Sequence, residues 1–140
     1  MIEVNGAAHI FLTVSDMTTA LPFYERLLNF LGLRTVIKAE GVMLYCVGGR
    51  TAVGVQQSAE EYRGERFVQS RVGLHHLCLR ARTQADVDAV HQELIAMGAT
   101  IVHAPEPGVW APGYYSVLFE DPDGIRLEVN HVPGRGLLKA

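Results

Sequence analysis

A repeated segment constrains the fold of this chain more than any other feature of its sequence. One copy begins His9-Ile-Phe-Leu-Thr-Val14 and the other begins His76-Leu-Cys-Leu-Arg-Ala81, an offset of 67 residues (76 − 9). Alternate residues in each run are apolar, which is typical of a half-buried strand. The repetition indicates two copies of one supersecondary unit.

A helix is predicted after each of these strands, because apolar residues then return at spacings of three and four. This apolar stripe covers residues 20–31 in the first copy and 87–97 in the second. Gly32 and Gly98 follow the two stripes at nearly the same offset (98 − 32 = 66). Glycine is the usual residue just after a helix, so each helix is expected to end there.

Three short strands are predicted after each helix. They cover about residues 34–38, 42–47 and 51–57 in the first copy, and 100–103, 114–120 and 125–130 in the second. A long loop is expected at 104–113. The sequence thus predicts an α+β fold of two tandem βαβββ modules, about 8–57 and 74–131, with a linker at about 58–73. One domain over 1–140 is expected, with a curved, cupped mixed sheet and helices on its outer side.

The composition excludes several classes of protein. The chain has 140 residues, 49% of them hydrophobic and 19% charged, which is typical of a globular domain with a substantial core. The net charge of −3 argues against a nucleic-acid surface. A transmembrane segment and a signal peptide are not expected. Cys46 and Cys78 lie in apolar runs and are interpreted as reduced core thiols, so a cytoplasmic protein is expected.

Three polar side chains are predicted to leave the helix-packed core on the same side of their strands. His9, His76 and Glu128 occupy alternate positions to the apolar residues that face the helices. Two imidazoles and one carboxylate suit a divalent metal ion with open positions, such as Fe, Mn, Zn or Ni. An ion bound there would keep about one positive charge and favour a substrate with anionic or paired oxygens. His75 is expected to point the other way.

The sequence resembles the vicinal oxygen chelate superfamily, which includes glyoxalases, bleomycin-resistance proteins and dioxygenases. The most specific parts of the resemblance are His9-Ile-Phe-Leu-Thr-Val-Ser-Asp16, Gly73-Leu-His-His-Leu-Cys-Leu79 and Phe119-Glu-Asp-Pro-Asp-Gly-Ile-Arg-Leu-Glu-Val129. The resemblance covers about residues 8–137. Within the superfamily, the chain is similar to small single-domain bacterial members. It implies that His9, His76 and Glu128 are three of the family's four metal-ligand positions.

The fourth ligand position departs from the family pattern. Glu128 corresponds to Gly54 in the first module, where glyoxalase I has a glutamate. Gln56 lies one pleat further along the same face, and a bulge could bring it to the metal. Without a bulge, the resemblance implies a three-ligand site. Glyoxalase chemistry needs a base to move a proton, so the reaction stays open between a lyase or isomerase step and an oxygenase or transferase step.

The resemblance also implies a homodimer, because edge strands in this family often pair with a second chain. The lead hypothesis is therefore a metal-dependent enzyme that acts on a small oxygen-bearing substrate. The alternative is a metal-free protein of the bleomycin-resistance type that sequesters a drug. The candidate pocket residues are Phe11, Cys78, Arg80, Trp110, Tyr115, Leu118 and Arg126.

Overall fold

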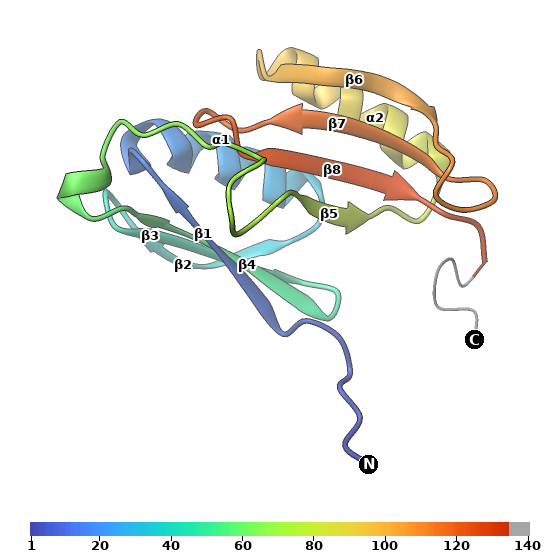
Figure 1. Ribbon diagram of the computed structural model, residues 1–140, viewed down its shortest axis with the longest axis horizontal. Helices are drawn as coiled ribbons and strands as arrows, with labels where there is room; N and C mark the ends of the chain where they lie inside the picture. Colours follow the sequence, from blue (N-terminus) through green and yellow to red (C-terminus); the bar gives the residue numbers. More distant parts are fainter. Residues whose placement is uncertain (135–140) are drawn as a thin grey trace. The chain divides into compact units, whose positions relative to one another are not determined.

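Each half of the chain forms one compact unit with the same order of elements. Figure 1 shows the computed structural model, which describes residues 1–134 and divides into unit 1, Met1–Arg66, and unit 2, from Phe67 onward. Unit 1 contains β1 (His9–Val14), α1 (Met17–Phe30), β2 (Arg34–Ala39), β3 (Met43–Gly48), β4 (Thr51–Gln57) and the short 3₁₀ helix η1 (Glu60–Tyr62). Unit 2 contains β5 (Leu77–Arg80), α2 (Gln84–Ala96), β6 (Thr100–Pro107), β7 (Tyr115–Glu120) and β8 (Arg126–His131).

The two units have the same sheet topology. Unit 1 has the strand order β1-β4-β3-β2 and unit 2 has the order β5-β8-β7-β6. In each sheet the first strand pairs in parallel with the last, and the other neighbours are antiparallel. The predicted α+β fold with two βαβββ modules is confirmed. The sheets are two four-stranded mixed sheets, and the prediction of one domain over 1–140 stays a prediction.

Local signals begin and end both helices. The Asp16 side chain accepts a hydrogen bond from the Thr18 amide at 2.9 Å and caps α1. Thr83 and Asp86 form a reciprocal capping box at the start of α2. The helix ends also agree with the prediction, because the glycines at 32 and 98 have positive φ angles of 85° and 69°.

Each helix packs on one face of the sheet in its own unit. α1 contacts β2, β3 and β4, and α2 contacts β6, β7 and β8. The alternation predicted for the strands is observed, since Leu12 and Val14 of β1 and Leu127 and Val129 of β8 are buried. Residues between them, including Glu128, therefore leave the strand on the face away from the helix.

The long loop predicted at 104–113 begins later than expected. β6 continues to Pro107 and pairs with β7 through two register shifts. The prolines of this segment argued against a strand, but β6 lies at the edge of its sheet, where proline is tolerated.

Arg135, a candidate substrate contact in the C-terminal tail, lies outside the described residues. Among residues 1–134, no helix has the length and apolar character needed to cross a membrane.

Candidate functional site

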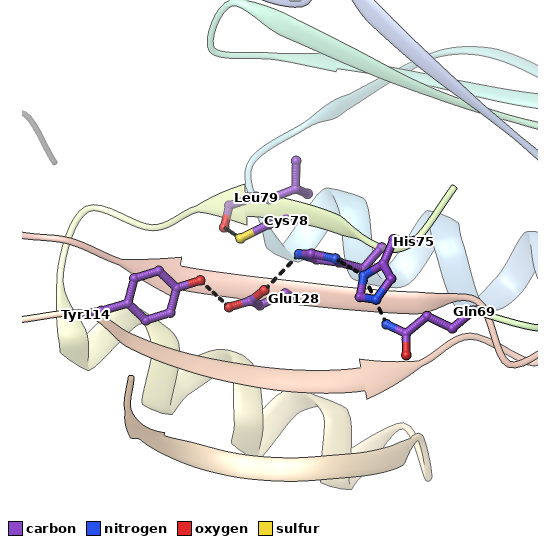
Figure 2. A network of polar contacts seen from close by, with 7 residues as sticks. Gln69, His75, Cys78, Leu79, Tyr114 and Glu128 are labelled. Carbon is purple, nitrogen blue, oxygen red and sulfur yellow. Dashed lines mark hydrogen bonds and ion pairs between the residues drawn. The ribbon is translucent and has the colours of Figure 1, made fainter. Parts of the chain in front are cut away.

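A chain of polar contacts in unit 2 centres on Glu128 of β8. Figure 2 shows Tyr114 on one side of the Glu128 carboxylate and His75 with Gln69 on the other. The Tyr114 hydroxyl donates a hydrogen bond to Glu128 Oε1. His76 Nε2 lies 3.3 Å from Glu128 Oε2. The two carboxylate oxygens thus have different partners, and the Glu128 side chain is only 11% exposed.

Polar contacts link His76 to His75, and His75 to Gln69. The Gln69 amide nitrogen lies 3.2 Å from His75 Nδ1, and this amide can only donate. His75 Nδ1 also lies 2.8 Å from His76 Nδ1, and one of these two nitrogens must donate to the other. In the neutral tautomer with its proton on Nδ1, His76 presents the lone pair of Nε2 toward Glu128.

The prediction that His75 points away from His76 is wrong. Both histidines precede β5, which begins at Leu77, so the alternation of a strand does not apply to them. Their rings meet edge to face, with centroids 5.0 Å apart. His75 therefore orients the candidate ligand His76 instead of lying apart from it.

Two neutral groups border the carboxylate. Burial, followed by the charge of Glu128, raises the pKa of the Cys78 thiol to about 12. Burial and the hydrogen bond to Glu128 also raise the pKa of Tyr114 above its ordinary value. Both groups thus keep their protons at neutral pH, and Glu128 is bordered by donors and not by further anions. Cys78 is half-buried, not a fully buried core thiol, whereas Cys46 is buried, and both are free.

Unit 1 has an aromatic ring where unit 2 has this carboxylate. Gly54 pairs with Phe11 as Glu128 pairs with Cys78, so the predicted equivalence of positions 54 and 128 is confirmed. A Cβ atom on Gly54 would lie 2.3 Å from the Phe11 ring, which therefore covers the glycine. The Phe11 ring also stacks on Tyr45, and its centroid lies 5.7 Å from that of His9.

The fourth-ligand prediction for Gln56 required a bulge in its strand. β4 pairs with both neighbours in a continuous register, so no bulge shifts Gln56. Gln56 is exposed at the end of this strand. The neighbouring Gln57 side chain instead binds the backbone, accepting from the Met17 amide and donating to the Ser15 carbonyl.

Three of the predicted pocket residues have partners away from the carboxylate. Arg126 contacts Glu120 on the adjacent strand at 3.1 Å. Arg80 donates to the carbonyl oxygens of Val132 and Gly134. The Tyr115 hydroxyl donates to Asp88 of α2 at 2.7 Å.

The remaining predicted pocket residues differ in exposure and in their place in unit 2. Leu118 pairs with Glu128 across β7 and β8, and Cys78 pairs with it across β5 and β8. Both therefore lie beside the carboxylate. Trp110 is 75% exposed in the loop before β7. Phe11 belongs to unit 1, where it is 43% exposed.

Sequence reasoning missed Tyr114, which precedes β7 by one residue. Alternation within the strand predicted at 114–120 places Tyr114 on the same face as Leu118 and Tyr115 on the opposite face, so naming Tyr115 as the pocket residue was the error. The two adjacent tyrosines were the available signal. The structure brings Tyr114, and not Tyr115, to the carboxylate.

Comparison with known proteins identifies the family. The model of the Glyoxalase/Bleomycin resistance protein/Dioxygenase superfamily matches residues 6–129. The chain belongs to this superfamily. Members of this superfamily generally use a divalent metal ion. Within residues 1–134, no group of three or more histidine, cysteine, aspartate or glutamate side chains is arranged to hold one.

Individual relatives agree with this family and fold. The uncharacterized protein YqjT of Bacillus subtilis (strain 168) is 30% identical over 122 residues, 86% of this chain and 94% of that protein. The Salmonella typhimurium virulence protein STM3117 is 28% identical over 128 residues, 91% of this chain and 84% of that protein. The crystal structure of a glyoxalase-like protein from Bacillus halodurans matches with a TM-score of 0.80 and 25% identity, covering 91% of this chain and 96% of that chain.

Proposed function

We propose that this superfamily member is a divalent-metal-dependent enzyme acting on a small, anionic, oxygen-bearing substrate. His76 and Glu128 would be metal ligands. His9, which the sequence predicts as a third ligand, stays a prediction. The reaction would be a lyase or isomerase step of the glyoxalase kind, or an oxygenase or transferase step. The proposal rests chiefly on the contact between His76 Nε2 and Glu128 Oε2.

A shared cation would favour this contact. With the proton of the neutral ring on Nδ1, His76 Nε2 offers a lone pair to a carboxylate oxygen 3.3 Å away, and two such atoms repel each other. A proton on Nε2 would make a hydrogen bond to the carboxylate, and a metal ion would bind both atoms. Metal ligation by histidine requires this deprotonated nitrogen, with the other ring nitrogen donating to a fixed partner. His75 provides that partner.

The separation of the two atoms also fits a shared ion. Histidine nitrogen and carboxylate oxygen bind ions such as zinc at about 2.0–2.2 Å. Two ligand atoms at these distances, with an angle between tetrahedral and octahedral values, lie about 3.0–3.4 Å apart. The observed 3.3 Å falls in this range. Nitrogen and oxygen donors are compatible with Fe, Mn, Zn or Ni.

The side chains around the pair have their own roles in the proposed site. A divalent ion held there would polarise an oxygen of the substrate. Tyr114 and the neutral Cys78 thiol add no charge beside Glu128, so the ion's positive charge is offset by one carboxylate only. This balance favours an anionic substrate. Arg126 is already paired with Glu120, which makes it a weaker candidate for binding that anion.

The test is metal content at defined sites. Protein prepared without an affinity tag would be stripped with a chelator and reloaded separately with Fe(II), Mn(II), Zn(II) and Ni(II), and metal per chain would be measured by mass spectrometry. The parent is expected to bind one equivalent of at least one ion. His76→Ala and Glu128→Ala should lose it, and His91→Ala on α2 is the matched control.

Two outcomes would contradict the proposal. A parent that never holds stoichiometric metal would remove the basis for a metal enzyme. Metal retained by both His76→Ala and Glu128→Ala would show that the ion binds elsewhere. His9→Ala tests whether His9 is a ligand as well, because undiminished metal affinity in that variant would exclude it.

A metal-free drug-binding protein is the second candidate, and the aromatic cluster of unit 1 favours it. His9, Phe11 and Tyr45 form consecutive ring contacts, and Phe11 is 43% exposed. Exposed aromatic rings bind flat apolar groups well. Tight binding of a bleomycin-type drug by the chelator-treated protein, abolished in Phe11→Ala, would support this candidate over the enzyme.

A further inference from the structure

We infer that Tyr114 is a positioning residue that occupies one oxygen of Glu128 and leaves the other, Oε2, as the single metal-binding atom of this carboxylate. The inference rests on the proposed function, because it assigns a role toward the ion that His76 and Glu128 would bind. Figure 2 shows the Tyr114 hydroxyl directed at the carboxylate from the side opposite Gln69 and His75.

The position of the Tyr114 ring is fixed by its own loop. The residue is only 8% exposed. Its backbone carbonyl accepts from the Gly108 amide at 2.9 Å, and its amide donates to the Ala111 carbonyl at 3.1 Å. A Cβ atom on Gly108 would lie 2.7 Å from Tyr114 Cδ1, so the ring packs directly against this glycine. The loop thus holds the Tyr114 hydroxyl against Glu128 Oε1.

The hydroxyl can play only one part in its contact with Glu128. A carboxylate accepts hydrogen bonds, so the phenol must donate. The bond engages Glu128 Oε1, while His76 Nε2 faces Oε2.

Holding one oxygen changes how the carboxylate can bind an ion. A free carboxylate can rotate and bind through either oxygen or through both. With Oε1 hydrogen-bonded to Tyr114, Glu128 would bind an ion through Oε2, the oxygen that faces His76. Hydrogen-bond partners of metal ligands typically change metal affinity by about 10–100-fold when they are removed.

Adjacent tyrosines provide a matched pair of variants. Tyr114→Phe removes the hydroxyl that binds Glu128, and Tyr115→Phe removes one that binds Asp88 on the other side of the sheet. Dissociation constants for Zn(II) and Mn(II) would be measured by competition with a chelator. We expect Tyr114→Phe to weaken binding about 10–100-fold and Tyr115→Phe to leave it nearly unchanged. The visible spectrum of Co(II)-loaded protein should change only in Tyr114→Phe.

The outcomes distinguish this inference from the proposed function. A parent that binds no metal contradicts the proposed function itself. A parent that binds metal, with equal affinities and Co(II) spectra in the two phenylalanine variants, overturns the role of Tyr114 alone. If Tyr114→Phe does not fold, Gly108→Ala displaces the ring while keeping the hydroxyl, and it should weaken metal binding in the same direction. Unchanged binding there would also overturn the inference.

Discussion

Adding one methyl group at Gly54 should disturb the packing of the Phe11 ring over this glycine in unit 1. In the Gly54→Ala variant, the new Cβ would meet Phe11 Cε1, Cζ and Cδ1 at 2.3, 2.5 and 2.6 Å. Ordinary contacts of a Cβ atom lie at 3.4–4 Å. The Phe11 ring must therefore withdraw by about 1 Å or more, and because it is partly exposed it can rotate away.

The cost follows from the contacts that the ring would lose. Phe11 stacks on Tyr45 with centroids 5.6 Å apart and meets His9 edge to face at 5.7 Å. Aromatic pairs contribute about 0.5–1.5 kcal/mol each, so losing both costs about 1–3 kcal/mol. Replacing glycine by alanine in a strand returns about 0.5–1 kcal/mol. The net destabilisation in the parent background is then about 0–2.5 kcal/mol.

A double-mutant cycle isolates this packing term. In a Phe11→Ala background the methyl group meets no ring, so Gly54→Ala should be neutral or stabilising by about 0.5–1 kcal/mol. The free energies of unfolding would come from urea titrations followed by circular dichroism. The coupling should be about 1–3 kcal/mol with Phe11→Ala and close to zero with Val36→Ala, an exposed control on β2. Additive effects with Phe11→Ala would refute the reasoning.

Three further substitutions test how individual side chains hold the two units, each by urea unfolding. Thr83→Ala removes half of the capping box with Asp86 and should cost about 1 kcal/mol, while Thr83→Asn should cost much less. Asp121→Ala leaves two amides of the β7–β8 turn without their carboxylate acceptor and should cost about 3 kcal/mol. Gln57→Ala removes the acceptor of the Met17 amide and should cost about 1–2 kcal/mol without changing metal affinity. A cost below about 0.3 kcal/mol in any of the three would contradict the corresponding contact.

Much of the fold could be predicted because its signals are local. The helix ends depend on Gly32 and Gly98, whose positive φ angles are costly for other residues, and such positions are readable in one sequence. The end of β6 could not be predicted in the same way. Its last residues pair with β7 through register shifts, and that pairing depends on tertiary contacts that outweigh the local preference of proline.

In the candidate site, too, some residues could be predicted from local sequence signals and others depend on tertiary contacts. Glu128 lies inside a regular strand, so its direction follows from alternation with Leu127 and Val129. His75 lies just outside a strand, where no periodicity fixes the side chain. Tyr114 also precedes its strand, and its contact with Glu128 depends on the path of the preceding loop as well as on alternation. Sequence could therefore identify the candidate ligands of unit 2 but not all of the contacts that orient them.

One pair of equivalent positions differs in side-chain size between the two modules, and the size of each partner explains why both members of the pair differ together. The parallel pair is Phe11 with Gly54 in unit 1 and Cys78 with Glu128 in unit 2. In unit 1 a large ring on the first strand requires the absence of a side chain on the last. In unit 2 a small thiol on the first strand leaves room for a carboxylate on the last. The lack of a side chain at position 54 and the presence of the aromatic cluster are therefore linked by packing. A carboxylate placed at position 54 alone would meet the Phe11 ring, so restoring that ligand requires a smaller residue at position 11 as well.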